Sequence, residues 1–208
     1  MLAIIQGNKM QIATRRLLIF LLFFCLASPV SAKEVTLSDR AKNIRAKFVE
    51  LRNNIDNTNL WEEYLKILPK TKTDFKRIFD PDDFSELYNS SHEYIFILNS
   101  TPETNRKEII ALVFSITKLG ARGCCDAWSA LHEVAVTYAI QDTRGFLSSL
   151  KSLNAKERQN VIKFIADKEN HRVFEDYQVI IDKLTNLQEQ EIAKEFENAR
   201  TLRMKARH

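Results

Sequence analysis

The stretch that decides the fold lies in the middle of the chain, at residues 102–140: PETNRKEIIALVFSITKLGARGCCDAWSALHEVAVTYAI. Its apolar residues cover nearly every side of two helices, which are separated by a turn containing Gly120 and Gly123. Glycine favours a helix end, and Asp126 favours the start of the next helix because its carboxylate is stabilised at a helix N-terminus. A helix that is apolar all round has to be surrounded by protein. We therefore expect a central helical hairpin around which the other helices pack.

The rest of the chain has the composition of helices joined by short turns. Only three glycines and three prolines follow residue 32, and no window alternates with a period of two, so we expect no strands. The sequence predicts an all-α protein, a single compact domain of about ten short helices around the central hairpin. Stacked helix pairs of the HEAT kind stay open as an alternative to a closed bundle. We expect helices near residues 37–55, 59–68, 72–79, 81–88, 91–99, 102–119, 124–140, 143–151, 155–167 and 172–206, with a break near Asn186 left open in the last.

Several predicted helices begin at residues that can cap a first turn. In a capping box, a side chain at the N-cap and a carboxylate three residues later satisfy backbone N–H groups of that turn. The sequence offers four such pairs: Asn59 and Glu62, Ser90 and Glu93, Asn154 and Glu157, and Asn186 and Glu189.

The first 32 residues have the pattern of a cleaved secretory signal peptide. Three basic and no acidic residues come before or at the start of an apolar run at 17–27, and small residues end the segment at Ala32. Eleven residues of helix span about 16 Å, which is too short to cross a bilayer. We expect export to the periplasm or the extracellular space, a mature domain of residues 33–208, and no transmembrane segment after cleavage. Met10 is an alternative start, because the signal pattern lies almost entirely after it.

Removal of this segment changes the charge argument. The full chain has 31 Lys and Arg against 27 Asp and Glu, and residues 33–208 keep 28 against 27. A nucleic-acid-binding surface needs a clustered excess of basic side chains. The near-neutral balance therefore predicts no nucleic-acid partner.

Cys124 and Cys125 are the only cysteines after residue 32. Adjacent cysteines can form a strained, labile disulfide in an oxidising compartment, and a helix N-terminus makes a thiol more reactive. The alternative is that both are small apolar side chains filling core space. His132 lies seven residues beyond Cys125, about 10.5 Å along a helix, which is too far for a catalytic pair. We expect this histidine to be satisfied locally beside an apolar stripe.

An acidic cluster lies within a stretch rich in aromatic residues, and together they are a candidate partner surface. The aromatic residues of this stretch are Phe75, Phe79, Phe84, Tyr88, Tyr94 and Phe96. The same acids are also explained by a helix N-terminus, and the absence of a turn glycine argues against an EF-hand-like calcium loop. Aromatic residues concentrate where protein interfaces form. The predicted surface consists of Asp80, Asp82, Asp83, Glu86 and Tyr88.

The C-terminal segment is a second candidate surface. Its narrow apolar stripe suits docking on the domain, coiled-coil pairing or weak contact with an anionic membrane surface. The stripe and its basic end contain Ile192, Phe196, Leu202 and Arg203. A docked helix with a solvated end is the default interpretation.

These features favour a non-enzymatic protein that binds another protein after export. The sequence has no recognisable catalytic, metal or cofactor motif, so we expect no cofactor. In size, export signal and short helices the chain resembles small bacterial periplasmic proteins, including some immunity proteins that neutralise delivered toxins. An immunity-type inhibitor and an assembly factor are both versions of this hypothesis. Two alternatives stay open: a thiol- or redox-active protein using Cys124 and Cys125, and a carrier of an apolar ligand between helices.

Overall fold

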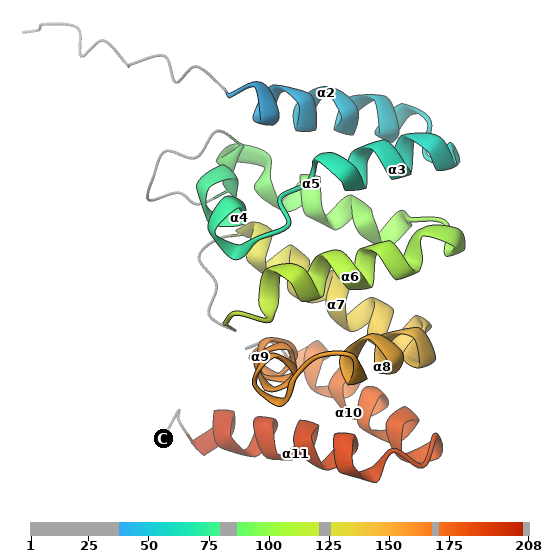
Figure 1. The fold of residues 1–208 in the computed structure, drawn as a ribbon, viewed down its shortest axis with the longest axis vertical. Helices are drawn as coiled ribbons and strands as arrows, with labels where there is room; N and C mark the ends of the chain where they lie inside the picture. The colour runs from blue at the N-terminus through green and yellow to red at the C-terminus, as the bar shows by residue number, and fades with distance from the viewer. Residues whose placement is uncertain (1–37, 80–86, 121–125, 168–170, 206–208) are drawn as a thin grey trace, which may run out of the picture. The chain divides into compact units, whose positions relative to one another are not determined.

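The computed structural model describes residues 38–79, 87–120, 126–167 and 171–205 (Figure 1). The chain divides into two units, Met1–Glu34 and Val35–His208, and every described residue belongs to the second. The segment interpreted as a signal peptide is outside the described residues, so its cleavage stays a prediction.

The described residues form ten α-helices and three short 3₁₀ helices and contain no strand, which confirms the all-α fold. The helices alternate with short connections, as the scarcity of glycine and proline predicts. The α-helices are α2 (Asp39–Asn53), α3 (Thr58–Ile67), α4 (Lys72–Phe79), α5 (Ser91–Phe96), α6 (Arg106–Thr117), α7 (Asp126–Gln141), α8 (Thr143–Lys151), α9 (Ala155–Ala166), α10 (His171–Asn186) and α11 (Gln190–Lys205). The 3₁₀ helices are η2 (Tyr88–Ser90), η3 (Ile97–Ser100) and η4 (Glu103–Asn105).

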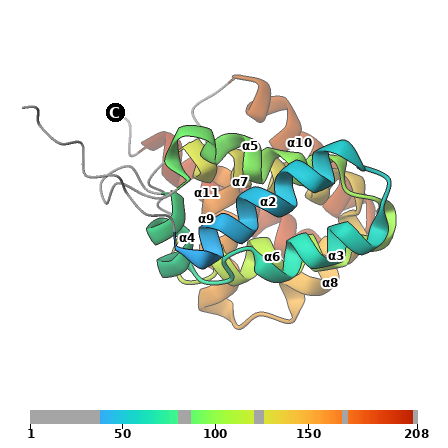
Figure 2. The same ribbon diagram turned by 90° about the horizontal axis from the view of Figure 1, so that it is seen from above.

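The helices of this unit stack in two layers (Figures 1 and 2). One layer contains α3, α6 and α8 in contact one after another, and the other contains α5, α7 and α10. At one end of the stack α2 packs on α3 and α5, and at the other end α11 packs on α9 and α10. This order of contacts is the one that stacked helix pairs produce, although the helices differ in length from 6 residues in α5 to 16 in α7.

Helix α7 is at the centre of this arrangement. It contacts α5, α6, α8, α9 and α10, and ten of its sixteen residues are buried. The predicted hairpin partner α6 does contact α7, but α7 packs more extensively on α5. Helix α6 is also not enclosed on every side, because Glu108 and Ala111 are exposed along one strip. Helix α7 also has a strip that is not fully buried, where Ser129 is exposed and Glu133 and Thr137 are half-buried at a spacing of four residues. The all-round burial expected from composition therefore fails on one face of each helix.

The structure contains the helix break that the sequence left open near Asn186. Helix α10 ends at Asn186, and Gln188 adopts a left-handed backbone with a φ of 62° before α11 begins. Such a residue commonly ends a helix, because its N–H bonds back to the last turn. Here the Gln188 N–H donates to the Thr185 carbonyl, and the Glu189 N–H donates to the Leu184 carbonyl.

The predicted capping boxes differ in outcome. Asn154 and Glu157 form the full reciprocal box at the start of α9. Ser90 is at the N-cap of α5 but makes no side-chain capping bond. The other two predictions were wrong about the residue: α3 is capped by Asn57 instead of Asn59, and Asn186 ends a helix instead of starting one.

Candidate protein-binding groove

An open groove of about 660 Å³ runs between α3 and α6. Two leucines with little exposure form its floor, Leu65 from α3 and Leu112 from α6, at 7% and 6% exposed. Polar, charged and small side chains form the two rims. The lining residues are Thr58, Glu62, Leu65, Lys66 and Lys70 on the α3 side, and Thr104, Asn105, Glu108, Ala111, Leu112 and Ser115 on the α6 side.

The two helices that form the groove run in the same direction (Figure 1). Their first turns are close together, because α3 contacts η4 immediately before α6. Their last turns are also close, because the Lys72 ammonium, just beyond α3, donates to the carbonyl of Gly120, just beyond α6, at 3.4 Å. Residues at equivalent depths of the two helices therefore face each other across the groove.

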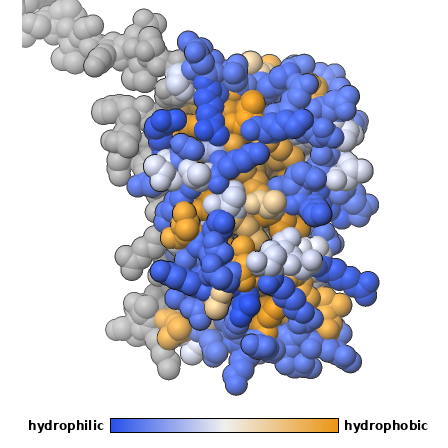
Figure 3. Space-filling model, viewed as in Figure 1, coloured by the Kyte–Doolittle hydropathy of each residue, from blue (hydrophilic) through white to orange (hydrophobic). Residues whose placement is uncertain are grey.

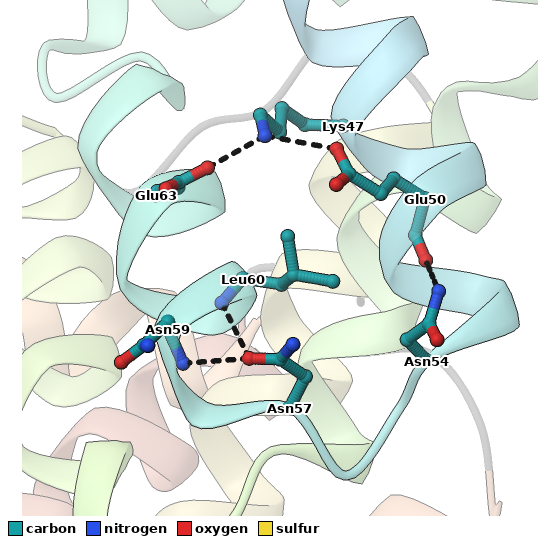
Figure 4. Close-up of polar contacts among 7 residues, drawn as sticks. All are labelled: Lys47, Glu50, Asn54, Asn57, Asn59, Leu60 and Glu63. Carbon is teal, nitrogen blue, oxygen red and sulfur yellow. Dashed lines mark hydrogen bonds and ion pairs between the residues drawn. The ribbon is translucent and has the colours of Figure 1, made fainter.

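The first half of α3 is fixed by its own N-cap and by an ion pair with α2 (Figure 4). The Asn57 side-chain oxygen accepts from the N–H groups of Asn59 and Leu60, at 3.1 and 3.3 Å. The Lys47 ammonium on α2 bridges Glu50 at 2.8 Å and Glu63 on α3 at 2.6 Å. These hydrogen bonds raise the pKa of Lys47, mainly through Glu50 and then Glu63, and the bond from Lys47 lowers the pKa of Glu63.

The end of α3 is fixed by one arginine of α2. The Arg40 guanidinium donates to the carbonyls of Ile67 and Leu68, at 3.1 and 3.0 Å. Carbonyls at a helix end have no partner within the helix, so a cation there satisfies them and also interacts favourably with the helix dipole. Arg40 is 3.7 Å from the carboxylate of Asp74 on α4 as well. One side chain thus connects α2, α3 and α4 at the Lys66–Lys70 end of the groove.

The inner face of α3 is anchored in the core. Trp61 is fully buried and its indole N–H donates to the Ile55 carbonyl at 2.7 Å. The Tyr64 hydroxyl donates to the Tyr94 carbonyl of α5 at 2.6 Å. Burial, and secondarily Tyr94, raise the pKa of the Tyr64 phenol well above its ordinary value, so it stays a neutral donor. The α3 wall is therefore held rigidly while its outer face stays open.

Charge is distributed unevenly along the groove. Because the helices are parallel, Glu62 and Glu108 lie in its first half, and Lys66 and Lys70 lie toward its other end. Glu62 and Lys66 are 3.8 Å apart, and their side chains are 53% and 71% exposed. Neither Lys70 nor Glu108 makes an ion pair with any other described residue. On the face seen in Figure 3, apolar side chains come to the surface between hydrophilic ones.

The predicted acidic and aromatic surface is described only in part. Asp80, Asp82, Asp83 and Glu86 lie outside the described residues. Tyr88 is 40% exposed. Nearby on α5, Phe96 is 43% exposed and its ring stacks on His92 with centroids 5.0 Å apart. Most aromatic residues of that stretch are in the core, among them Phe75, Phe79 and Tyr94.

His132 is a buried core histidine, 4% exposed, on α7. Its Nε2 is 2.8 Å from the Ile165 carbonyl of α9, and its ring packs edge-on against Phe164. Ser129 on the same helix is exposed, so the two side chains do not form one polar patch. The predicted position of His132 beside apolar side chains therefore agrees with the structure, but the polar partner is on a different helix and not local in sequence.

The remaining predicted residues are divided between the core and the surface. Cys124 and Cys125 lie outside the described residues. On α11, Ile192 is 5% exposed and Phe196 is fully buried against Tyr177 and Phe146, whereas Leu202 is 62% exposed. The backbone of Arg203 continues the helix, and its side chain is outside the description. The first half of α11 thus docks on the domain.

Within the described ranges, no group of three or more His, Cys, Asp or Glu side chains is arranged to hold a metal ion. No helix in the same part of the chain combines the length and the apolar character needed to cross a bilayer.

The groove itself was missed by the sequence interpretation, although a signal for it exists. Glu108, Ala111 and Ser115 are spaced at i, i+3 and i+7, which places them on one face of a helix. They interrupt a helix that is otherwise strongly apolar. A narrow strip of small and polar residues in such a helix indicates a side left uncovered.

Comparison of the chain with models of known families, with curated proteins and with solved structures finds no match.

Proposed function

We propose that this protein acts after export by binding a segment of another protein in the groove between α3 and α6. It works as a non-enzymatic binding protein, for which an immunity-type inhibitor and an assembly factor are the two concrete versions. The partner contacts the leucine floor and the charged rims and is held in place by the rigid wall of α3.

The groove is the observation that carries this proposal. It is elongated along two helices, it is open to solvent, and its floor is apolar with polar residues on both sides. An apolar centre with a polar rim is the usual composition of a protein-binding surface. Laying an apolar helix face into a groove between two helices is a common mode of recognition.

The redox hypothesis and the apolar-ligand carrier have less support than a protein-binding role. The thiol or redox hypothesis rests on Cys124 and Cys125, which the structure does not describe. A carrier of an apolar ligand needs a site that buries most of the ligand surface. The α3–α6 groove is open along its length and bears Glu62, Glu108, Lys66 and Lys70 at its rims, which suits a polypeptide better.

Binding is tested by placing a photo-crosslinking amino acid at Ala111, which is exposed in the groove. The matched position is Gln159, exposed on α9 and outside the groove. We expect irradiation of the producing cells to join residue 111 to one exported protein, identified by mass spectrometry, and residue 159 to give no such product. Equal labelling from both positions, or none from residue 111, would overturn the proposal.

A variant whose groove is filled by a large side chain provides a second test of binding. Ala111→Trp places a large side chain in the opening, and affinity purification of this variant should lose the cross-linked protein. Gln159→Trp should retain it. Thermal unfolding of both variants separates a loss of binding from a loss of folding.

Export is tested by intact mass. Protein recovered from its native compartment should begin at Lys33, since the small residues Val30, Ser31 and Ala32 would precede the cleavage. A mass that retains residues 1–32 would overturn export with cleavage.

A further inference from the structure

The charges on the groove have an order that a partner has to match. Glu62 and Glu108 flank one half of the floor, and Lys66 and Lys70 are toward the other end. The Glu62–Lys66 pair is open to solvent on both members, so it contributes little and can exchange partners. Lys70 and Glu108 lack an ion-pair partner within the described part of the chain. All four charges are therefore available to an incoming segment.

The dimensions favour a helix as the occupant. Helix α3 has 10 residues, so the groove runs for about 15 Å alongside it, or nearly three helical turns, and continues to Lys70 just beyond its end. The floor between the charged ends consists of Leu65, Leu112 and the exposed methyl group of Ala111. A small residue in the floor allows close approach of another backbone. A helix with a narrow stripe of apolar residues fits between two parallel helices in this way.

Helix electrostatics fix the direction. A helix is most stable with acidic residues in its first turn and basic residues in its last turn. The acidic start of such a helix pairs with Lys66 and Lys70, and its basic end pairs with Glu62 and Glu108. The occupant then runs opposite to α3 and α6, which also sets its dipole favourably against theirs.

From these observations we infer that the groove takes an amphipathic helix of a partner protein, acidic at its N-terminus and basic at its C-terminus, lying antiparallel to α3 and α6. This inference rests on the proposed function and names the chemistry of the partner. It also predicts which ends of the two molecules meet.

The probe is a set of side-chain-stapled helical peptides of about 16 residues, long enough to cover the groove. All share one Ala/Leu stripe. The first has acidic residues in its first two turns and lysines in its last two, the second has only acidic residues and the third only lysines. Binding to the purified full chain is measured by fluorescence anisotropy. We expect the first peptide to bind about tenfold more tightly than either of the others, since each of them has one end facing like charge.

The matched protein variant is K66E/K70E, which makes both ends of the groove acidic without touching its floor. Both lysines are exposed, so the fold should be unaffected, as circular dichroism would verify. We expect this variant to prefer the all-lysine peptide. An unchanged ranking, or equal affinity of all three peptides for the natural chain, would overturn the charge order.

The direction of the bound peptide is measured by photo-crosslinking, with a benzophenone placed at either end of the first peptide. The N-terminal label should react with residues 66–70, and the C-terminal label with residues 58–62 or 104–108. The opposite pattern would overturn the antiparallel arrangement. A cellular partner that is cross-linked at residue 111 but whose binding ignores K66E/K70E would refute this inference and leave the proposed function standing. Peptides that rank as expected, with no protein cross-linked in cells, would instead refute the proposed function.

Discussion

Helices α6 and α7 have similar apolar sequences and different surroundings. Each contacts at least five other helices and leaves one strip incompletely buried, but the strip of α6 (Glu108, Ala111 and Ser115) lines the groove with α3, whereas that of α7 (Ser129, Glu133 and Thr137) does not. Ala135 on α7 is 2% exposed, and Ala111 on α6 is open to solvent in the groove. The difference shows that the overall hydrophobicity of a helix does not determine whether it is enclosed. The residues at one helical spacing do, and on α6 those residues are Glu108, Ala111 and Ser115.

The strongest way to challenge this contrast is to create a cavity under α7. Leu131 is fully buried, and Leu131→Ala should destabilise the protein by about 2–5 kcal/mol, because the lost transfer energy adds to the cost of the cavity. The measurement is urea unfolding followed by far-UV circular dichroism. Leu112→Ala in the groove floor is the matched change and should cost less, since its space opens to solvent. An equal loss at both positions would show that Leu112 in the groove floor is enclosed as fully as Leu131.

Adding volume to the core around α7, instead of removing it, is a second test of how tightly this helix is packed. Ala135→Leu adds three carbon atoms where the core has no room, and we expect a loss of about 1–3 kcal/mol. The unfolding midpoint in urea reports it directly. A variant as stable as the natural protein would mean that the space around α7 is less tightly filled than its burial indicates.

The position of α3, which forms one wall of the groove, depends on the hydrogen bonds of Arg40, whereas the stability of α7 depends on packing. Arg40→Ala removes two hydrogen bonds to the last carbonyls of α3, and we expect a loss of about 1–2 kcal/mol. Hydrogen exchange should show the loss concentrated in the last turn of α3. Asp74→Asn removes two partly exposed ion pairs, with Arg40 at 3.7 Å and with Arg77 at 3.9 Å, and should change stability by less than about 1 kcal/mol. If both substitutions have the same effect, the carbonyl contacts of Arg40 are not what holds the wall.

The bridge from Lys47 to Glu63 gives a smaller effect that depends on pH. The pKa of Glu63 is lowered from 4.5 in the folded protein, so its contribution is present above that pH and is lost as the pH falls through the lower folded value. The pKa of Lys47 is raised from 10.5, so its contribution is present below that pH and is lost as the pH rises through the higher folded value. The urea midpoints of the natural protein and Glu63→Gln should therefore differ most between these limits.

Glu108→Gln is the control for this titration, because Glu108 has no ion pair among the described residues. Its midpoint should follow that of the natural protein at every pH. A difference for Glu63→Gln that persists unchanged at pH values far below 4.5 would show that the carboxylate charge is not its cause.

Local chemistry explains what the sequence could predict about the fold. The predicted bounds of α4 and α8 agree with the structure at both ends, and the full capping box of α9 is where Asn154 and Glu157 indicate it. Each of these features depends on residues within a few positions of one another. The predicted helices at 91–99 and 102–119 were less accurate, because the chain passes through η3 and η4 between α5 and α6. A 3₁₀ turn has nearly the same sequence preferences as a helix end, so the pattern does not separate them.

The candidate site could not be predicted in the same way, because it depends on which helices become neighbours. Leu65 and Leu112 are 47 positions apart, and nothing in the spacing of either indicates that α3 and α6 lie parallel. That arrangement is set by anchors such as Arg40 and Tyr64, whose partners are distant in sequence. Of the residues singled out beforehand, the structure describes the side chains of Tyr88, Ile192, Phe196 and Leu202 and the backbone of Arg203, and the groove is formed by others.

The smallest expected effect is the most specific test of the contrast between α6 and α7. Ala111→Leu makes the same chemical change as Ala135→Leu, in a neighbouring helix and with the same small difference in helix propensity. Because residue 111 opens into the groove, the added side chain has room, and we expect stability to stay within about 0.5 kcal/mol of the natural protein. Urea unfolding of the two variants side by side measures the difference. A loss at residue 111 as large as that at residue 135 would mean that the groove is closed by the chain itself, and a partner helix would then have no space to enter.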